Sequence, residues 1–203
     1  MAADSDRVGI QEGSLMMMSG SFYIAKYRDP GSQGEDSHFI CEEMHTIGVA
    51  DGVGGWQMRG VDARIYARQL MNNSLLATLT QTHPHNRIDP MKVLDEAFAK
   101  TKAAGSLTAC VITLHEDMLH AVNMGDSAFM VIRQGAAVYR SPIQQRSFNF
   151  PYQLGSCDKP PQAQVMKVAV EAGDVIVAGT DGLFDNLSET QILESVVYNE
   201  LET

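Results

Sequence analysis

The sequence predicts an α+β fold in which antiparallel β-sheets pack together and helices cover their outer faces. Segments rich in Val, Ile and Thr outnumber the segments with helical periodicity, which favours several short strands and few helices. The helices do not alternate regularly with the strands, and this argues against a doubly wound parallel sheet. With 203 residues, of which 44% are hydrophobic and 20% charged, the chain can bury a substantial core.

The first part of the chain is expected to contain short strands and then a helix. We predict a disordered N-terminus over residues 1–20, an edge strand within 21–27, and strands at 39–41 and 46–50. A helix is predicted over 63–79, because its apolar residues recur at the spacing of one buried stripe. The stripe consists of Ala63, Tyr66, Ala67, Leu70, Met71, Leu75 and Leu79.

A second helix is predicted from Pro90 to Thr101. Asp89 is a suitable N-cap, and proline is favoured at the first helical position because it needs no backbone donor there. Gly105 is expected to end this helical region, since glycine disfavours continuation of a helix.

Beyond residue 107 the pattern changes to strands and ends with a helix. Glu171 to Asp174 are interpreted as a hairpin loop between the last two strands. The last helix is expected to begin at Ser188, with Gln191 as its capping-box partner. We interpret residues 21–203 as one domain. The strands are predicted over 107–114, 119–124, 128–132, 136–139, 165–170 and 175–178.

Composition excludes several classes of function. The formal net charge of −10 argues against broad nucleic-acid binding, which needs a basic surface. No apolar run is long enough to span a bilayer, so we expect no membrane partner. No targeting segment is evident, which makes a cytoplasmic or nuclear location the default expectation, and a monomer is expected. Cys41, Cys110 and Cys157 form no CxxC pair, so neither a zinc site nor a disulfide framework is expected.

Acidic residues lie beside glycines at four places in the chain. Glu35 and Asp36 follow Gly34, Asp51 and Asp181 each precede a glycine, and Asp126 follows one. The last three acids come directly after apolar runs that are predicted to be strands. Carboxylates at the ends of buried strands can converge, and they then need a cation or a proton to offset their repulsion. Oxygen ligands of this kind favour Mg²⁺ or Mn²⁺.

Several ordered motifs carry a resemblance to a known family. Residues 49–56 (Val-Ala-Asp-Gly-Val-Gly-Gly-Trp) resemble the Asp-Gly-x-Gly-Gly signature of the metal-dependent protein phosphatases, the PPM (type 2C) family. Residues 34–36, 105–109, 123–127 and 179–186 are similar, in the same order, to further motifs of that family. The resemblance implies a four-layer α-β-β-α sandwich, and it implies a protein serine/threonine phosphatase.

The resemblance also implies a role for each acidic motif. Asp51 would bridge two Mg²⁺ or Mn²⁺ ions, the carbonyl of Gly52 would bind one of them, and Asp181 the other. Asp126 would help to hold a third, looser ion together with Asp181. In its alternative role, Asp126 would only stabilise the turn beside Ser127.

Glu35 and Asp36 would hold metal-bound waters, and the water that bridges the two ions would attack the phosphorus of a phosphoserine or phosphothreonine. The expected partners are therefore phosphorylated protein substrates. No serine or cysteine nucleophile is predicted, because the sequence has no GxSxG motif and no cysteine in a phosphate-binding loop.

The sequence departs from the family pattern at three points. Val53 occupies a position where many members have the histidine proposed to protonate the leaving group. The arginine expected shortly before Glu35 is absent; Gly31 and Ser32 are found there. The family's final strand, with one more ligand Asp, is expected to be missing after Thr203. These departures leave open a weakly active or inactive pseudophosphatase that serves as a binding module. A regulatory metal-binding domain unrelated to phosphatases is a third alternative.

Overall fold

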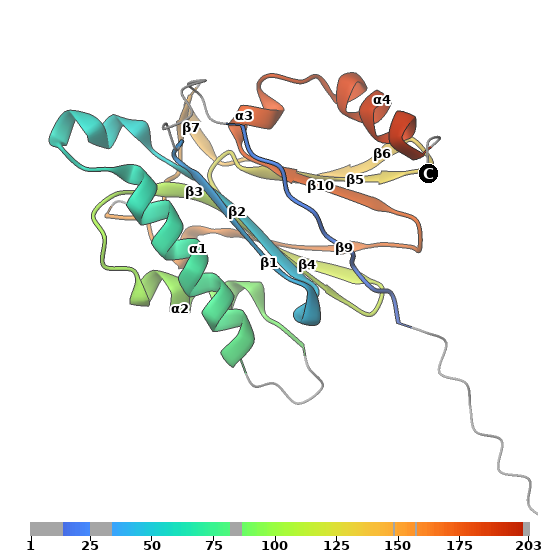
Figure 1. Cartoon of the computed structure of the whole chain (residues 1–203), viewed down its shortest axis with the longest axis horizontal. Helices are drawn as coiled ribbons and strands as arrows, with labels where there is room; N and C mark the ends of the chain where they lie inside the picture. Colours follow the sequence, from blue (N-terminus) through green and yellow to red (C-terminus); the bar gives the residue numbers. More distant parts are fainter. Residues whose placement is uncertain (1–13, 25–33, 82–86, 148, 157, 201–203) are drawn as a thin grey trace, which may run out of the picture.

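The computed structural model describes residues 14–24, 34–81, 87–147, 149–156 and 158–200. Two β-sheets pack face to face and helices cover both outer faces, as Figure 1 shows. The layer order is helices, first sheet, second sheet, helix. The predicted α-β-β-α arrangement is therefore confirmed.

The first sheet has five antiparallel strands in the order β1-β2-β3-β4-β9. Its outer face is covered by α1 (Ala63–Thr80) and α2 (Pro90–Lys100). The strands are β1 (Asp36–Cys41), β2 (Thr46–Gly52), β3 (Leu107–His115), β4 (Met118–Met124) and β9 (Gln164–Ala169).

The second sheet has three antiparallel strands in the order β10-β5-β6. It is covered by α4 (Glu189–Glu200), and the short α3 (Asp181–Phe184) follows directly on β10. The strands are β10 (Val175–Gly179), β5 (Ala128–Arg133) and β6 (Ala136–Arg140).

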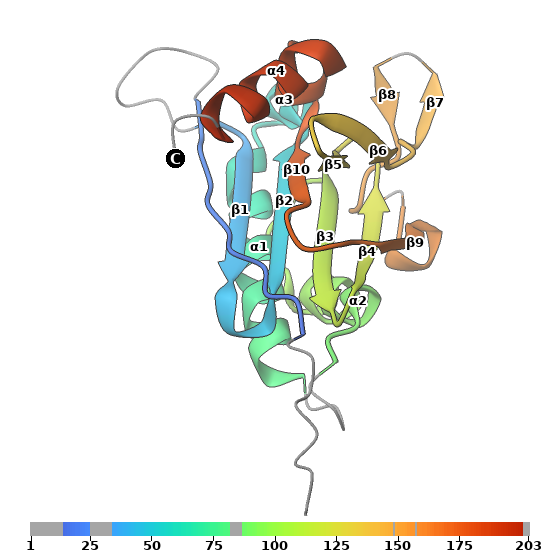
Figure 2. The same cartoon turned by 90° about the vertical axis from the view of Figure 1, so that its right-hand side faces the viewer.

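Shorter elements connect these layers. A separate hairpin is formed by β7 (Gln145–Ser147) and β8 (Phe150–Pro151), and in Figure 2 it projects beyond the two sheets. Three 3₁₀ helices complete the described elements: η1 (Glu42–Met44), η2 (Gly54–Arg59) and η3 (Pro160–Gln162).

The layers follow from the alternation of side chains along the strands. In β3, Val111 packs under α1 and α2, whereas its neighbours Cys110 and Ile112 point between the sheets. In β5, Phe129 points between the sheets and Met130 packs toward α4. All five side chains are buried, as expected for strands covered on both faces.

One predicted connection is wrong. The loop Glu171–Asp174 does not close a hairpin, because β9 pairs with β4 in the first sheet and β10 pairs with β5 in the second. The loop instead carries the chain from one sheet to the other. Turn residues indicate where the chain changes direction, but they do not indicate with which strands the two flanking strands will pair.

The helices agree with the sequence closely. Asp89 caps α2 by accepting a hydrogen bond from the backbone N–H of Met91 at 3.0 Å. Ser188 and Gln191 form the predicted capping box, with backbone-to-side-chain bonds of 2.9 and 3.3 Å. In α1 the predicted stripe is correct up to Leu75. Leu79 is exposed, and Thr78 takes the buried position, because it continues the i, i+4 sequence from Ser74.

The segment before β1 lies along the edge of the sandwich. Residues 14–24 contain no strand, so the predicted edge strand is wrong at 21–24; 25–27 lie outside the described residues, as do 1–13. Leu15 and Met17 pack against the core between the sheets, and the backbone N–H of Met17 donates to His45 Nδ1 at 3.3 Å. The packed part of the chain thus includes residues before the predicted boundary at 21.

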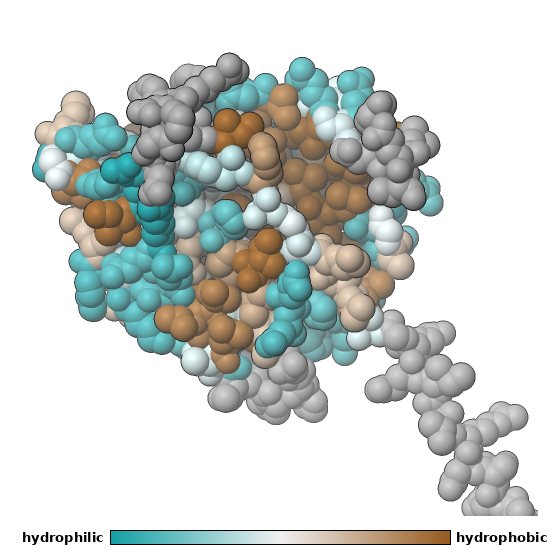
Figure 3. All heavy atoms as spheres, in the orientation of Figure 1, coloured by the Kyte–Doolittle hydropathy of each residue, from teal (hydrophilic) through white to brown (hydrophobic). Residues whose placement is uncertain are grey.

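The edge strand β10 of the second sheet is less completely covered than the inner strands of either sheet. Every residue of β10 is half-buried, and Figure 3 shows apolar side chains gathered beside the N-terminal segment. Cys110 and Cys41 are buried free thiols. Among the described residues, no helix has the length and apolar character required to cross a bilayer.

Candidate metal centre

Asp36 and Asp51 are brought together by the pairing of β1 with β2. The two residues are direct partners in the antiparallel register, so their side chains lie on the same face of the first sheet. The backbone N–H of Gly52 donates to the carbonyl of Glu35 at 3.1 Å, which fixes the ends of the strands. The two acidic motifs, separated in sequence, therefore meet at one end of the first sheet.

Asp181 and Asp126 approach the same point from the second sheet. Asp181 begins α3 directly after β10, and Asp126 lies in the turn that leads from β4 into β5. Because Gly179 pairs with Ala128, the end of β10 lies beside the start of β5. In Figure 2 the ends of β2, β4 and β10 lie at the same, upper end of the molecule.

The acids line a cleft of ≈ 910 Å³. Gly125 has φ +93° in the turn before Asp126, a conformation that favours glycine. The described lining residues include no Lys, Arg or His, so their side chains offer no cationic partner to these acids. The acidic residues of the lining are Glu35, Asp36, Asp51, Asp126, Asp181 and Asp185.

Asp51 is the central acid of the group. Its carboxyl group is within hydrogen-bonding reach of both Asp36 and Asp181. Burial, and then the charges of Asp36 and Asp181, raise the pKa of Asp51 to about 9. A carboxyl group with this environment binds a proton or a cation at neutral pH.

The neighbouring acids show the same effect to a smaller extent. Burial raises the pKa of Asp36, with a further contribution from the charge of Asp181, although hydrogen bonds with Asp51 and Thr180 oppose the shift. Burial also raises the pKa of Asp126, and a hydrogen bond donated by Gln145 Nε2 to Asp126 Oδ2 at 3.2 Å opposes it. Carboxyl groups from both sheets thus repel one another in this cleft.

Two glycines of residues 49–56 make room for this arrangement. A Cβ atom on Gly52 would lie 2.8 Å from the carbonyl oxygen of Ala63 and 2.9 Å from that of Glu35. A Cβ atom on Gly54 would lie 2.8 Å from Glu35 Oε2. Any larger residue at either position would have to displace the backbone or the Glu35 carboxylate.

The donor set fits a hard divalent cation. Four aspartates from both sheets, with the nearby carbonyl of Gly52, provide only oxygen ligands, which Mg²⁺ and Mn²⁺ prefer. Asp51 is hydrogen-bonded to both Asp36 and Asp181. Within the described part of the chain no three His, Cys, Asp or Glu side chains form a ready metal-binding group. A cation would relieve the repulsion that now requires shared protons.

The structure thus brings together the predicted residues Glu35, Asp36, Asp51, Gly52, Asp181 and Asp126 around one cleft. Asp185 lies at the C-cap of α3 and also lines the cleft. Gly31 and Ser32, where the family's arginine is missing, lie outside the described residues.

Sequence reasoning gave no role to several polar residues around the acids. Asn149 and Gln153 line the cleft, and Gln145 contacts Asp126. These residues come from the β7–β8 hairpin and the segment after it, which reach the acids only through the tertiary fold. Thr108, within the motif of residues 105–109, lines the cleft as the strand partner of Asp51. Trp56 is half-buried, and its indole N–H donates to Ser106 Oγ at 2.7 Å.

A two-sheet sandwich with converging carboxylates at one end defines the class of metal-dependent phosphatases. The sequence model described as Stage II sporulation protein E (SpoIIE) matches residues 44–200. The chain therefore belongs to this SpoIIE/PP2C-type family, the PPM phosphatases, as the motifs predicted.

Relatives and solved structures agree with this assignment. The chain is 50% identical over 200 residues to "Probable protein phosphatase 2C 55" of Arabidopsis thaliana, covering 97% of this chain and 42% of the relative. It is 39% identical over 184 residues to "Protein phosphatase PTC7 homolog fig" of Drosophila mojavensis, covering 81% and 58%. The structure of the photosystem II phosphatase PBCP aligns with a TM-score of 0.76 and 32% identity, covering 81% of this chain and 66% of that one. The chain thus spans about two fifths of the Arabidopsis relative's length.

Proposed function

We propose that this chain carries the metal centre of a protein serine/threonine phosphatase that requires Mg²⁺ or Mn²⁺. The observation that carries the proposal is the meeting of Asp51 with Asp36 and Asp181 in a cleft large enough for a phosphorylated side chain. The proposed substrates are phosphoserine and phosphothreonine in proteins, in keeping with the names of the relatives.

In the proposed site, Asp51 and Asp181 hold two ions from opposite sheets, together with the carbonyl of Gly52. Asp126 contributes to a third, weaker position. When bound, such ions lower the pKa of water and stabilise the negative charge of a phosphoryl group. The chain's own contribution is to fix these oxygen donors on strand ends before the substrate arrives.

Glu35 and Asp36 lie where they can accept protons from water in the cleft. Glu35 is held by Gln57, whose Nε2 donates to Glu35 Oε1 at 3.3 Å. Val53 lines the same cleft and cannot donate a proton to the leaving oxygen. That proton must therefore come from water or from a protonated carboxyl group in the cleft, which predicts slower turnover than with a histidine at this position.

The alternative of an inactive binding module is favoured by none of the comparisons. One experiment separates the two functions. The purified chain is assayed for Mn²⁺-dependent release of phosphate from a phosphothreonine peptide, beside Asp51→Asn. Asp95→Asn is the matched control, because Asp95 is an exposed residue of α2.

We expect turnover in the parent and in the Asp95 variant, and a fall in activity of at least about 100-fold in Asp51→Asn. Even residues that only hydrogen-bond to a metal ligand contribute up to that factor. Calorimetric titration with Mn²⁺ should show the same loss in affinity. Equal activity in all three proteins, or metal-dependent activity in none, would contradict the proposed function.

A further inference from the structure

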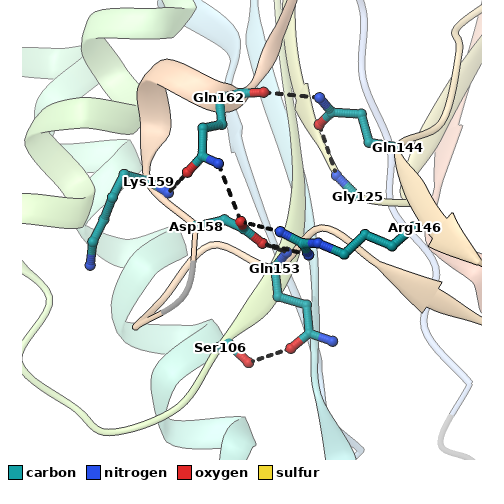
Figure 4. A network of polar contacts seen from close by, with 8 residues as sticks. All are labelled: Ser106, Gly125, Gln144, Arg146, Gln153, Asp158, Lys159 and Gln162. Carbon is teal, nitrogen blue, oxygen red and sulfur yellow. Dashed lines mark hydrogen bonds and ion pairs between the residues drawn. The ribbon is translucent and has the colours of Figure 1, made fainter.

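Gln153 lines the same cleft as the acids, in the segment that follows the β7–β8 hairpin. Its backbone position is fixed on both sides. The N–H of Gln153 donates to the buried carboxylate of Asp158 at 2.9 Å, and Leu154 exchanges two backbone hydrogen bonds with Leu107 of β3. Asp158 is itself held by Arg146 at 2.6 and 3.1 Å, as Figure 4 shows.

The orientation of the Gln153 amide is set by a directional chain of hydrogen bonds. The indole Nε1–H of Trp56 can only donate, and it donates to Ser106 Oγ at 2.7 Å. The hydroxyl of Ser106 in turn donates to Gln153 Oε1 at 2.9 Å. If the Gln153 amide were reversed, Trp56 Nε1 and Gln153 Nε2 would both donate to Ser106 Oγ. The hydroxyl hydrogen of the buried Ser106 would then lack a partner among the described residues.

The Nε2 group of Gln153 therefore remains available to donate a hydrogen bond to a ligand. In Figure 4 the oxygen end of this side chain is turned toward Ser106 and the nitrogen end is turned away from it. Asn186 also lines the cleft, but its Nδ2 already donates to the carbonyl of Gly182 at 3.0 Å. Gln153 thus presents an N–H donor in a cleft whose described lining contains no cationic side chain.

We propose that Gln153 is a substrate-binding residue whose Nε2 group donates a hydrogen bond to an oxygen of the phosphoryl group. Trp56 and Ser106 are positioning residues that keep this donor turned toward the cleft. The inference rests on the proposed phosphatase function, and it assigns a neutral amide to part of the task that a cationic side chain would perform. Hydrogen bonds to a charged oxygen are stronger than neutral ones, so the loss of this donor is measurable.

The test uses the whole chain with Mn²⁺ and two readouts, the KM for a phosphothreonine peptide and the Ki for inorganic phosphate as a product inhibitor. Gln153→Leu removes the donor, and Gln153→Glu replaces it with a carboxylate of the same shape. Asn72→Leu, an exposed amide of α1, is the matched control. We expect both constants to rise about tenfold in Gln153→Leu and further in Gln153→Glu, with the control unchanged.

The positioning role has its own prediction. Trp56→Phe should raise the Ki for phosphate in the parent but should add nothing in the Gln153→Leu background, because there the donor to be oriented is already gone. Additive effects of the two substitutions would contradict the relay. An unchanged Ki in Gln153→Leu, even with a raised KM for the peptide, would overturn the phosphate contact.

A readout that does not depend on turnover keeps this inference separate from the proposed function. In the presence of Mg²⁺, inorganic phosphate should shift the side-chain amide resonances of Gln153 in a saturable way. These resonances are identified by their absence from the spectrum of Gln153→Leu. A parent that shows no metal-dependent turnover refutes the proposed function, whereas an active parent whose Gln153 resonances ignore phosphate refutes the inference.

Discussion

The inner strands of the first sheet and the edge strand β10 of the second differ in how completely they are buried, although both sheets contribute to one site. Strands β3 and β4 of the first sheet are buried along almost their entire length, with helices on one side and the second sheet on the other. Strand β10 of the second sheet is only half-buried throughout. Asp36 and Asp51 come from the first sheet, and Asp181 comes from the second.

This difference has a consequence for the site. Asp51 lies near the end of β2, which pairs with the buried strand β3, whereas Asp181 follows an edge strand that is only half-buried. A cation held by acids of both sheets would link them, so metal binding should stabilise β10 more than β3.

The largest expected effect comes from truncating matched isoleucines of the two sheets. Ile112 of β3 and Ile176 of β10 both point between the sheets, but Ile112 is fully buried and Ile176 only partly. Ile112→Ala should lower the free energy of unfolding by about 4 kcal/mol, and Ile176→Ala by about 1.5 kcal/mol, since the cavity cost depends on burial. Urea unfolding measures both, and equal losses would contradict the comparison.

A smaller effect is expected from the ion pair that holds the start of β10. Arg133 of β5 donates to both carboxylate oxygens of Asp174, each at 2.7 Å, and the Asp174 side chain is only 2% exposed. Asp174→Asn should cost about 2 kcal/mol at pH 7, because Arg133 keeps its contact with Glu171 and is partly exposed to water.

The same pair predicts a pH dependence. The hydrogen bonds from Arg133 lower the pKa of Asp174 below its ordinary value of 3.8. The pair therefore stabilises the fold fully above about pH 4 and loses this contribution as the pH falls through the lowered folded-state pKa. The difference between parent and Asp174→Asn should shrink toward zero in that acidic range. A difference that stays constant down to pH 2 would show that the carboxylate charge is not responsible.

The smallest effect is expected at the outer layer of the first sheet. Asp89 caps α2, with its carboxylate accepting from the N–H groups of Met91 and Lys92. Asp89→Ala should lower the free energy of unfolding by about 1 kcal/mol, the usual cost of an N-cap. Asp95→Ala on the same helix serves as the control for loss of charge alone. Thermal unfolding compares the two variants, and equal shifts would argue against capping.

How far the sequence could predict this site depended on the kind of contact involved. Asp51 and Asp181 were identifiable because each carboxylate ends an apolar run beside glycine, a local pattern with a local cause. Gln153 was not, since the hydrogen bonds that orient its amide come from Ser106 and, through Ser106, from Trp56, and both residues are distant from Gln153 in sequence.

By itself, the sequence determined the three long helices with the N-terminal caps of two of them, most of the strands and the acidic residues at strand ends. These features depend on periodicity, capping side chains and backbone freedom within a few residues. Only the tertiary structure decided that β9 and β10 belong to different sheets, that Thr78 and not Leu79 is buried, and that Gln153 lines the same cleft as the acids. Strand pairing and cleft formation depend on contacts between residues far apart in the chain, and no local pattern encodes them.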